Sequence, residues 1–507
     1  MRKNTRNIHG HLRRLGALAG PVYAELLSGV LASVLTAFWT VRLGGAAVAA
    51  VTLAGTVENL LLGLVLVVAS GTGVSLARAR GAGDGAAAAR TARAAWRLCA
   101  AGGLALSLPG FLLREPLAGA FLDGPAAALA ADYFAVAFPA FGLFFGQRVA
   151  DELFKGAGDT RTPMRMALLS NALLLLLDPL LILGAGPVPA LGVPGAALAL
   201  ALSRAAALAV TLRLRPRATA PGAGTGAAAV GILRAGLPFG LDFTARMAVG
   251  TAQLALTAGF GVAAVAGYGL GYRLLLAATM AFYALRQAAA IEAARLTGAG
   301  AAEDLHDLRR AVRRSSLLAG GCAALLAAAG AVPLTALFIG DQEVAGQSVL
   351  FLRTAAPYLL PYALVVALGG LYQGMGAGRP VVLSVLVGLG AQLGASTALS
   401  GPFGVAGVWA GPAVGAVVQL VVLALGRVFR LTPGQRRGRA DGPGGCGRVT
   451  DMTTLPDGRV VPPAHAAERA MPAASVRRAG RMRRVGPTGV DRNARWSWQG
   501  LCRPVQS

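Results

Sequence analysis

One acidic residue interrupts a long apolar run, and its chemistry suggests proton transfer. Asp178 lies within residues 166–186, a run long enough to cross a bilayer as a helix, and Pro179 follows it directly. Proline removes a helix N–H and disturbs the packing one turn earlier. A low dielectric favours the neutral form of a carboxyl, which can then load and release a proton as water access changes. The alternative is a protonated, hydrogen-bonded acid with a structural role.

Further charged residues lie in other apolar runs. Glu25 and Glu58, in the first and second runs, are additional candidates for the proton site. Each could instead cap a polar neighbour or face a water-filled cavity without titrating. Asp242 and Arg246 are four residues apart on the seventh run, with the acid first, which is the favourable order for an ion pair on one helix face. We interpret them as a neutralised structural pair, and the alternative places Arg246 in a cation site.

Candidates for a substrate cavity complete this set. Arg273 and Arg286 on the eighth run could pair with Glu58, with Glu292 or with an anionic substrate, and Arg286 could instead extend its charge to the inner interface. Aromatic rings that could stack on a flat cation are Tyr133, Phe138, Tyr272 and Tyr358. Packing or a place in the interfacial belt is the alternative for such rings. The four cysteines have no paired spacing, so the sequence predicts neither a metal site nor a disulfide framework.

The composition indicates a protein that crosses a membrane many times. The chain has 507 residues, of which 55% are hydrophobic and 14% charged, and its mean hydropathy is +0.61. A soluble chain of this size needs far more surface charge. The net charge of +25 is concentrated between apolar runs and after residue 430, a distribution that argues against a nucleic-acid partner.

Twelve apolar runs predict twelve transmembrane helices. They are residues 16–41, 45–77, 94–113, 126–149, 166–186, 191–212, 232–260, 262–292, 315–339, 346–371, 379–400 and 404–428. Basic residues gather at the N-terminus and after every second run. The positive-inside rule therefore places both termini in the cytoplasm.

The two halves of the chain repeat. Ala77–Gly83 recurs 217 positions later as Ala294–Gly300, and Pro116-Leu117 recurs at the same offset as Pro333-Leu334. The GAG of 156–158 matches the GMG of 374–376, and LGVPG of 191–195 is echoed by FGVAG of 403–407. Six runs in each half give both halves the same orientation. The prediction is an all-α membrane protein of two pseudo-symmetric six-helix bundles, with the substrate path between them.

The resulting division of the chain has five parts. They are a basic cytoplasmic N-terminus (1–15), a first six-helix lobe (16–215), a cytoplasmic linker (216–230), a second lobe (231–430) and a disordered basic cytoplasmic tail (431–507).

Several motifs resemble the multidrug and toxic compound extrusion (MATE) family, of the polysaccharide-flippase-related superfamily. They are KGAGDTRTP at 155–163, SN…DPLLILG at 170–184 and LGVPGAALA at 191–199. The glycine loops fit the same family, and their motif residues are Gly81, Gly83, Gly156, Gly158, Asp159, Gly298 and Gly300. The resemblance implies a secondary antiporter that exports bulky, often cationic amphiphiles against inward protons or sodium ions.

The chain departs from the family pattern at three site positions. Family members commonly carry an aspartate fifteen residues after the first-helix proline, where this chain has Thr36. The asparagine one turn before the fifth-helix aspartate falls on Leu174, and the seventh-helix acid on Arg246. Asp178 is kept. We therefore assign cation coupling to Asp178, with Glu25, Glu58 and Thr36 as accessory candidates, and favour protons over sodium.

The leading hypothesis is a proton-coupled exporter of amphiphilic small molecules that works by alternating access. We expect it to be a monomer in the plasma membrane, with no cofactor and no enzymatic activity. A flippase for a lipid-linked sugar or other anionic lipid is the alternative, which Arg246 and Arg273 support. A membrane-embedded transferase needs clustered acids to hold Mg²⁺, and no such cluster stands at a helix end. An inactive family member is the last alternative.

Overall fold

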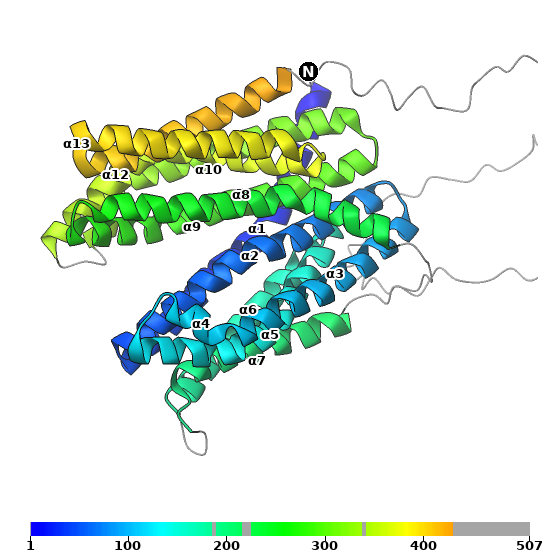
Figure 1. Ribbon diagram of the computed structural model, residues 1–507. Helices are drawn as coiled ribbons and strands as arrows, with labels where there is room; N and C mark the ends of the chain where they lie inside the picture. Colours follow the sequence, from blue (N-terminus) through cyan, green and yellow to red (C-terminus); the bar gives the residue numbers. More distant parts are fainter. Residues whose placement is uncertain (1, 185–188, 215–224, 337–340, 429–507) are drawn as a thin grey trace, which may run out of the picture. The chain divides into compact units, whose positions relative to one another are not determined.

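The computed structural model describes residues 2–184, 189–214, 225–336 and 341–428. These residues are almost entirely helical and contain no strand among them, so the predicted all-α fold is confirmed (Figure 1). The predicted tail from residue 431 onward, and the linker as far as residue 224, lie outside the described residues.

The helices form two consecutive sets, here called the first lobe and the second lobe. The first lobe comprises α1 Arg2–Thr40, the 3-10 helix η1 Val41–Leu43, α2 Gly45–Gly81, α3 Gly85–Leu112, α4 Arg114–Gly119, α5 Gly124–Gly156, α6 Arg161–Ile182 and α7 Gly192–Leu214. The second lobe comprises α8 Gly226–Ala258, α9 Val262–Gly298, α10 Ala302–Ala329, α11 Ala331–Ala336, α12 Gln342–Gly374 and α13 Gly378–Val428.

The twelve predicted spans correspond to these helices. Among the described residues, 10 helices are long and apolar enough to cross a membrane. One of them, α13, contains the last two predicted spans. The two spans are separated by Gly404, whose φ of 57° breaks the helical backbone inside α13. The remaining span is α10, whose first turn carries Glu303 and Asp304. The short helices α4 and α11 follow α3 and α10, and α11 lies inside the predicted ninth span, which therefore extends beyond the end of α10 at Ala329.

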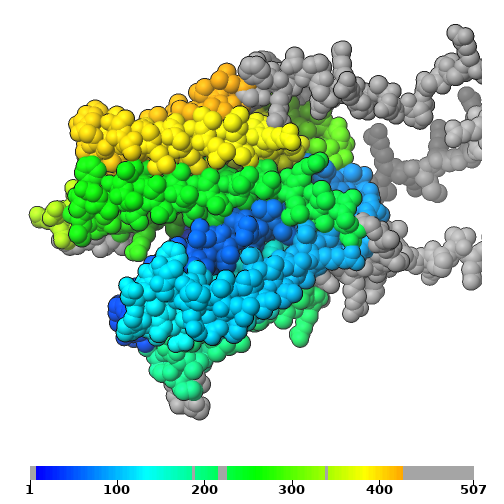
Figure 2. All heavy atoms as spheres, viewed as in Figure 1, coloured from blue at the N-terminus to red at the C-terminus, as the bar shows by residue number. Residues whose placement is uncertain are grey.

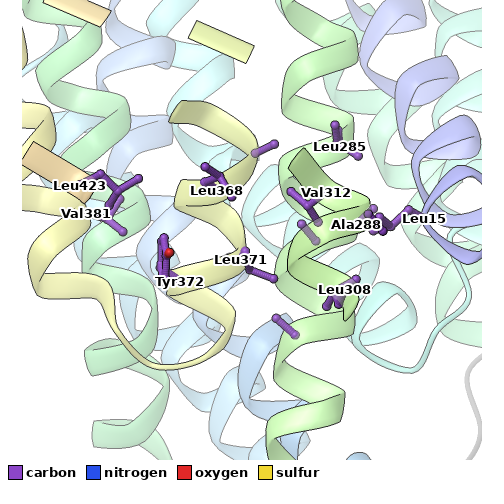
Figure 3. Packing of buried hydrophobic residues seen from close by; sticks show 14 of the residues in the cluster. Leu15, Leu285, Ala288, Leu308, Val312, Leu368, Leu371, Tyr372, Val381 and Leu423 are labelled. Atoms are coloured by element: carbon purple, nitrogen blue, oxygen red, sulfur yellow. The ribbon is translucent and has the colours of Figure 1, made fainter. Parts of the chain in front are cut away.

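The first helix begins earlier than the sequence predicts. The apolar run starts at residue 16, whereas α1 begins at Arg2. Ile8, Leu15 and Leu18 are spaced to share one face of a helix, and all three are buried in a cluster with side chains of α9, α10, α12 and α13. Figure 3 shows Leu15 beside Ala288 of α9 in this cluster. Residues 2–15 are too polar for the sequence pattern to predict a membrane helix there. Packing against the second lobe explains why α1 nevertheless includes them.

The backbone repeats as the motifs predict. The bounds of α2 and α9 are both offset by 217 positions, as are those of α4 and α11. Turn glycines repeat their conformation too. Gly44 has φ 96° and Gly261 has φ 99°, while Gly158 and Gly376, 218 positions apart, have φ 90° and 83°. These matched positions align the two lobes to within about one residue as far as the start of α13.

Backbones of the two lobes approach closely along α2, α8 and α9. A Cβ added at Gly71 of α2 would lie 2.1 Å from the Ile232 carbonyl oxygen of α8, and one added at Gly236 would lie 1.7 Å from that of Val67. Glycine permits such an approach between membrane helices because it has no side chain. Figure 2 shows the blue and green helices adjoining over part of their length, with a hollow between them toward the left.

Candidate functional site

Asp178 forms a small buried site with Thr36. Asp178 of α6 is 0% exposed, and the Thr36 hydroxyl of α1 donates a hydrogen bond of 2.6 Å to its Oδ2. Within the described residues, the other oxygen, Oδ1, is buried without a hydrogen-bond partner, and Asp178 forms no ion pair. The position that carries an aspartate in the resembling family therefore supplies a hydroxyl donor to the acid that is kept. A single hydroxyl stabilises a carboxylate far less than a cation would.

The site lies near the C-terminal end of α6. The predicted apolar run covers residues 166–186, whereas α6 begins at Arg161 and ends at Ile182. Asp178 thus stands four residues before the end, or about 6 Å along the axis. Thr36 stands equally close to the end of α1 at Thr40.

The second lobe has an uncharged counterpart of this pair. The turn glycines place Gln253 of α8 at the position of Thr36, and the offset of 217 to 218 between α6 and α13 places Ala395 or Ser396 at the position of Asp178. These two side chains also meet, because the Gln253 amide donates to the Ser396 hydroxyl at 3.2 Å. Both residues are buried. The repeat therefore keeps the contact between helices and loses the acid.

Glu58 belongs to a neighbouring polar group in the first lobe. The Tyr133 hydroxyl of α5 donates to Glu58 Oε1 at 3.1 Å, and Arg204 of α7 lies 3.9 Å from Oε2. Glu58, Arg204 and Phe138 line a small cavity of about 30 Å³. Three predicted residues, Glu58, Tyr133 and Phe138, are thus brought together in the first lobe.

Glu25 lies in a separate cluster. Its Oε1 accepts a hydrogen bond of 2.9 Å from Lys155 Nζ, and Arg148 is 3.7 Å away. Glu25 precedes Thr36 by eleven residues on α1, or about 16 Å along the helix. The structure therefore does not place Glu25 beside Asp178, where it could replace the missing aspartate directly.

Asp242 is held by two arginines rather than one. Arg246 Nε donates to Asp242 Oδ1 at 2.8 Å, as its spacing predicts, and Arg286 Nη1 of α9 donates to Oδ2 at 2.5 Å. Arg286 also donates to Gln373 of α12, and Arg246 to Gln419 of α13. Arg286 is 8% exposed, so its charge is drawn into the lobe and not extended to the interface.

Tyrosines surround Arg246. Its guanidinium carbon lies 5.2 Å from the ring centroid of Tyr362. Tyr358 stacks on Tyr362 with centroids 4.5 Å apart, and the Tyr283 and Tyr362 hydroxyls are 3.0 Å apart. Of the predicted cavity residues, Asp242, Arg246 and Tyr358 thus meet.

Two predicted cavity residues stand apart from this group. Tyr272 is exposed and stacks on Tyr268. Arg273 is exposed and has no hydrogen bond or ion pair within the described residues.

The sequence did not single out Tyr283, Tyr362, Gln373 or Gln419. One signal was available, because Tyr362 follows Tyr358 by four residues and so shares its helix face. The partners on α9 and α13 could not be identified, since no spacing relates residues on different helices.

The motif glycines hold the lobes and the helix ends. A Cβ on Gly81 would lie 1.9 Å from the Arg295 carbonyl oxygen, and one on Gly298 would lie 2.0 Å from that of Arg78. These two contacts are related by the repeat. Gly156 packs in the same way against Gly73 within the first lobe.

The remaining motif residues shape turns. Gly83, Gly158 and Gly300 have positive φ, which glycine adopts without strain. The Asp159 carboxylate accepts from the backbone N–H groups of Arg161 and Thr162 and so caps the start of α6. Among the described residues, no group of three or more His, Cys, Asp or Glu could hold a metal ion.

An all-α membrane protein with two repeated lobes and charged side chains buried in its helices has the architecture of a membrane transporter. The MatE family model matches residues 21–180 and 238–395, more than half of the chain. The chain belongs to this family of MATE transporters. Among curated proteins, none matches it.

Solved structures of the family share the fold. A mutant of the MATE transporter VcmN from Vibrio cholerae has a TM-score of 0.79 at 20% identity, covering 84% of this chain and 98% of its own. The bent form of VcmN has a TM-score of 0.77 at 20% identity, with the same coverage. A MOP superfamily transporter from Pyrococcus furiosus has 0.74 at 22%, covering 83% and 96%. At these identities the comparison establishes the fold.

Proposed function

We propose that this transporter exports amphiphilic small molecules in exchange for inward-moving protons. The two lobes would alternate access to a substrate path between them. It would act as a monomer in the cell membrane. The basic ends of α2 and α9 would lie on the cytoplasmic side with both termini, in keeping with the positive-inside rule.

The observation that carries this proposal is the state of Asp178. Its carboxyl is buried, has one hydroxyl partner in Thr36 and leaves Oδ1 unpaired within the described residues. Such a group binds a proton when sealed from water and releases it when water reaches the unpaired oxygen. Asp242 is the internal contrast, because two guanidinium groups pair with its two carboxyl oxygens.

A proton suits this site better than a metal cation. One carboxyl and one hydroxyl suffice to bind a proton, whereas hard cations take several oxygen ligands. Leu174, one turn before Asp178, contributes an apolar side chain where the resembling family has an amide. The aligned Gln253–Ser396 pair has no carboxyl, so it offers no second charged site.

The test is Asp178→Asn in inverted membrane vesicles, with proton release followed by a pH-sensitive dye on adding amphiphilic dyes of either charge. Asparagine keeps an oxygen for the Thr36 hydroxyl but exchanges no proton. We expect substrate-induced proton release to vanish in this variant and to persist without sodium in the native protein. Asp132→Asn, the same change at an exposed position, serves as the control. Unchanged proton release in Asp178→Asn would exclude Asp178 as the proton carrier.

A flippase for an anionic lipid is the second candidate. The observation in its favour is the surplus positive charge of Arg246 and Arg286 over Asp242. Reconstituted protein that moves a lipid-linked pyrophosphate between leaflets, and no amphiphilic dye, would establish this function instead of drug export.

A further inference from the structure

The polar centre of the second lobe carries more positive than negative charge. Arg246 and Arg286 share the single carboxylate of Asp242. Their other hydrogen-bond partners within the described residues, Gln419 and Gln373, are neutral. An uncompensated charge within membrane helices is expensive and usually serves a function. One arginine would have been enough to neutralise Asp242, so the second needs a separate explanation.

The two arginines have different surroundings. Arg286 is 8% exposed, spends its donors on Asp242 and Gln373, and lies 5.1 Å over the Phe239 ring. It fixes the position of the carboxylate. The Arg246 side chain is 11% exposed, and within the described residues its Nη1 group has no hydrogen-bond partner. Arg246 therefore has both an N–H group that is available to a ligand and the positive charge that Asp242 does not neutralise.

The tyrosines add the rest of a binding site. The stacked rings of Tyr358 and Tyr362 form an aromatic surface beside the guanidinium. The Tyr283 hydroxyl lies 3.0 Å from that of Tyr362, so it belongs to the same group of rings. Hydroxyl and guanidinium donors bind the oxygens of carboxylate, sulfonate and phosphate groups, and stacked rings bind flat apolar surfaces.

We propose that Arg246, with Tyr283, Tyr358 and Tyr362, binds the acidic group of an aromatic substrate, so that the cargo of this transporter is an aromatic organic anion. The proposal rests on the proposed export function only in that the ligand is the cargo. It differs from the expectation of cationic substrates that the family resemblance implies. Asp242 acts as a positioning residue, since it orients the Arg246 side chain through Nε and leaves Nη1 for the ligand.

The test compares two probes that share one ring system and differ in charge. Naphthalenesulfonate and naphthyltrimethylammonium are titrated into the full chain in detergent, and binding is followed by tryptophan fluorescence. We expect the sulfonate to bind at least about tenfold more tightly. Removing a charged hydrogen-bond donor costs roughly a factor of ten to a hundred in affinity, which is the loss expected for the sulfonate in Arg246→Gln. Arg234→Gln, at an exposed position three turns earlier on α8, should bind as the native protein does.

Two further measurements keep the outcome clear. Tyr358→Phe removes one hydroxyl without disturbing the ion pairs, so it should weaken sulfonate binding several-fold and leave cation binding unchanged, even if Arg246→Gln fails to fold. Asp132→Asn, at an exposed position of α5, should bind the sulfonate as the native protein does. The titration in detergent involves no proton gradient, which separates this site from proton coupling. Equal or tighter binding of the ammonium probe, or native sulfonate affinity in both Arg246→Gln and Tyr358→Phe, would overturn the proposal.

Discussion

The crossing of α2 and α9 makes Gly81 a position where one methyl group should separate the lobes. The Cβ of Gly81→Ala would lie 1.9 Å from the Arg295 carbonyl oxygen, and ordinary contact begins at 3.4 Å. Backbone atoms cannot move aside as a flexible side chain can. The helices must therefore part by about 1.5 Å, and such overpacking costs roughly 1–3 kcal/mol. Each 1.4 kcal/mol changes a population about tenfold, so the population of molecules in which α2 and α9 touch at Gly81 should fall about five- to 150-fold.

The assay is electron spin resonance distance measurement between two spin labels. Ala86 on α3 and Glu303 on α10 are exposed positions related by the repeat, and they lie close to the crossing. We expect Gly81→Ala to shift the distance distribution toward longer separations. Gly55→Ala is the control, because it lies on the same helix and its Cβ would meet nothing within 4 Å.

The reciprocal contact sharpens this test. Gly298→Ala places its Cβ 2.0 Å from the Arg78 carbonyl oxygen and should produce the same shift. Once one methyl group has separated the helices, the second meets less resistance, so the double variant should shift by less than the sum of the two. A native distance distribution in Gly81→Ala, or full additivity in the double variant, would refute the reasoning.

Two other predictions concern contacts that stabilise the fold, both read from thermal unfolding in detergent. Arg78 Nη2 donates to the Gly374 carbonyl at the end of α12 at 3.0 Å, so Arg78→Ala should cost about 1.5–3 kcal/mol, whereas exposed Arg80→Ala should leave the unfolding temperature unchanged. Leu371 is 0% exposed, so Leu371→Ala should cost about 2–5 kcal/mol, whereas Leu176→Ala, at a side chain that is 69% exposed, should have little effect. Equal effects of a variant and its control would contradict either prediction.

The sequence predicts the repeat well, because the repeat consists of patterns that are local in the sequence. Runs of apolar residues mark the spans, and glycines mark turns whose positive φ few other residues adopt. The first residues of α1 were missed because their burial depends on helices of the other lobe. The sequence also predicts a boundary between two spans at the Gly404 break within α13. The motif FGVAG of 403–407, which echoes LGVPG of 191–195, lies at this boundary.

In the candidate sites, too, contacts within one helix could be predicted from the sequence and contacts between helices could not. The Asp242–Arg246 pair was predictable, because four residues on one helix fix a shared face. The contribution of Arg286 was not, since its partner lies on another helix. The Thr36–Asp178 contact could be anticipated only by resemblance, which aligns Thr36 with a known site position. Glu25 was a candidate for the proton site only because it is an acid within an apolar run. Its position on α1 separates it from Asp178, and composition does not reveal such a separation.

The uncharged Gln253–Ser396 pair has a consequence for the energy source of transport. If Asp178 is the proton carrier, as proposed, the absence of an acid at the matching place in the second lobe means that one proton would enter per cycle. A monoanion leaving as a proton enters moves two charges in the same direction, worth about 4.6 kcal/mol for every 100 mV of membrane potential. A monocation leaving instead moves no net charge. Voltage would therefore favour anion export by a factor on the order of a thousand and leave cation export to the pH gradient alone.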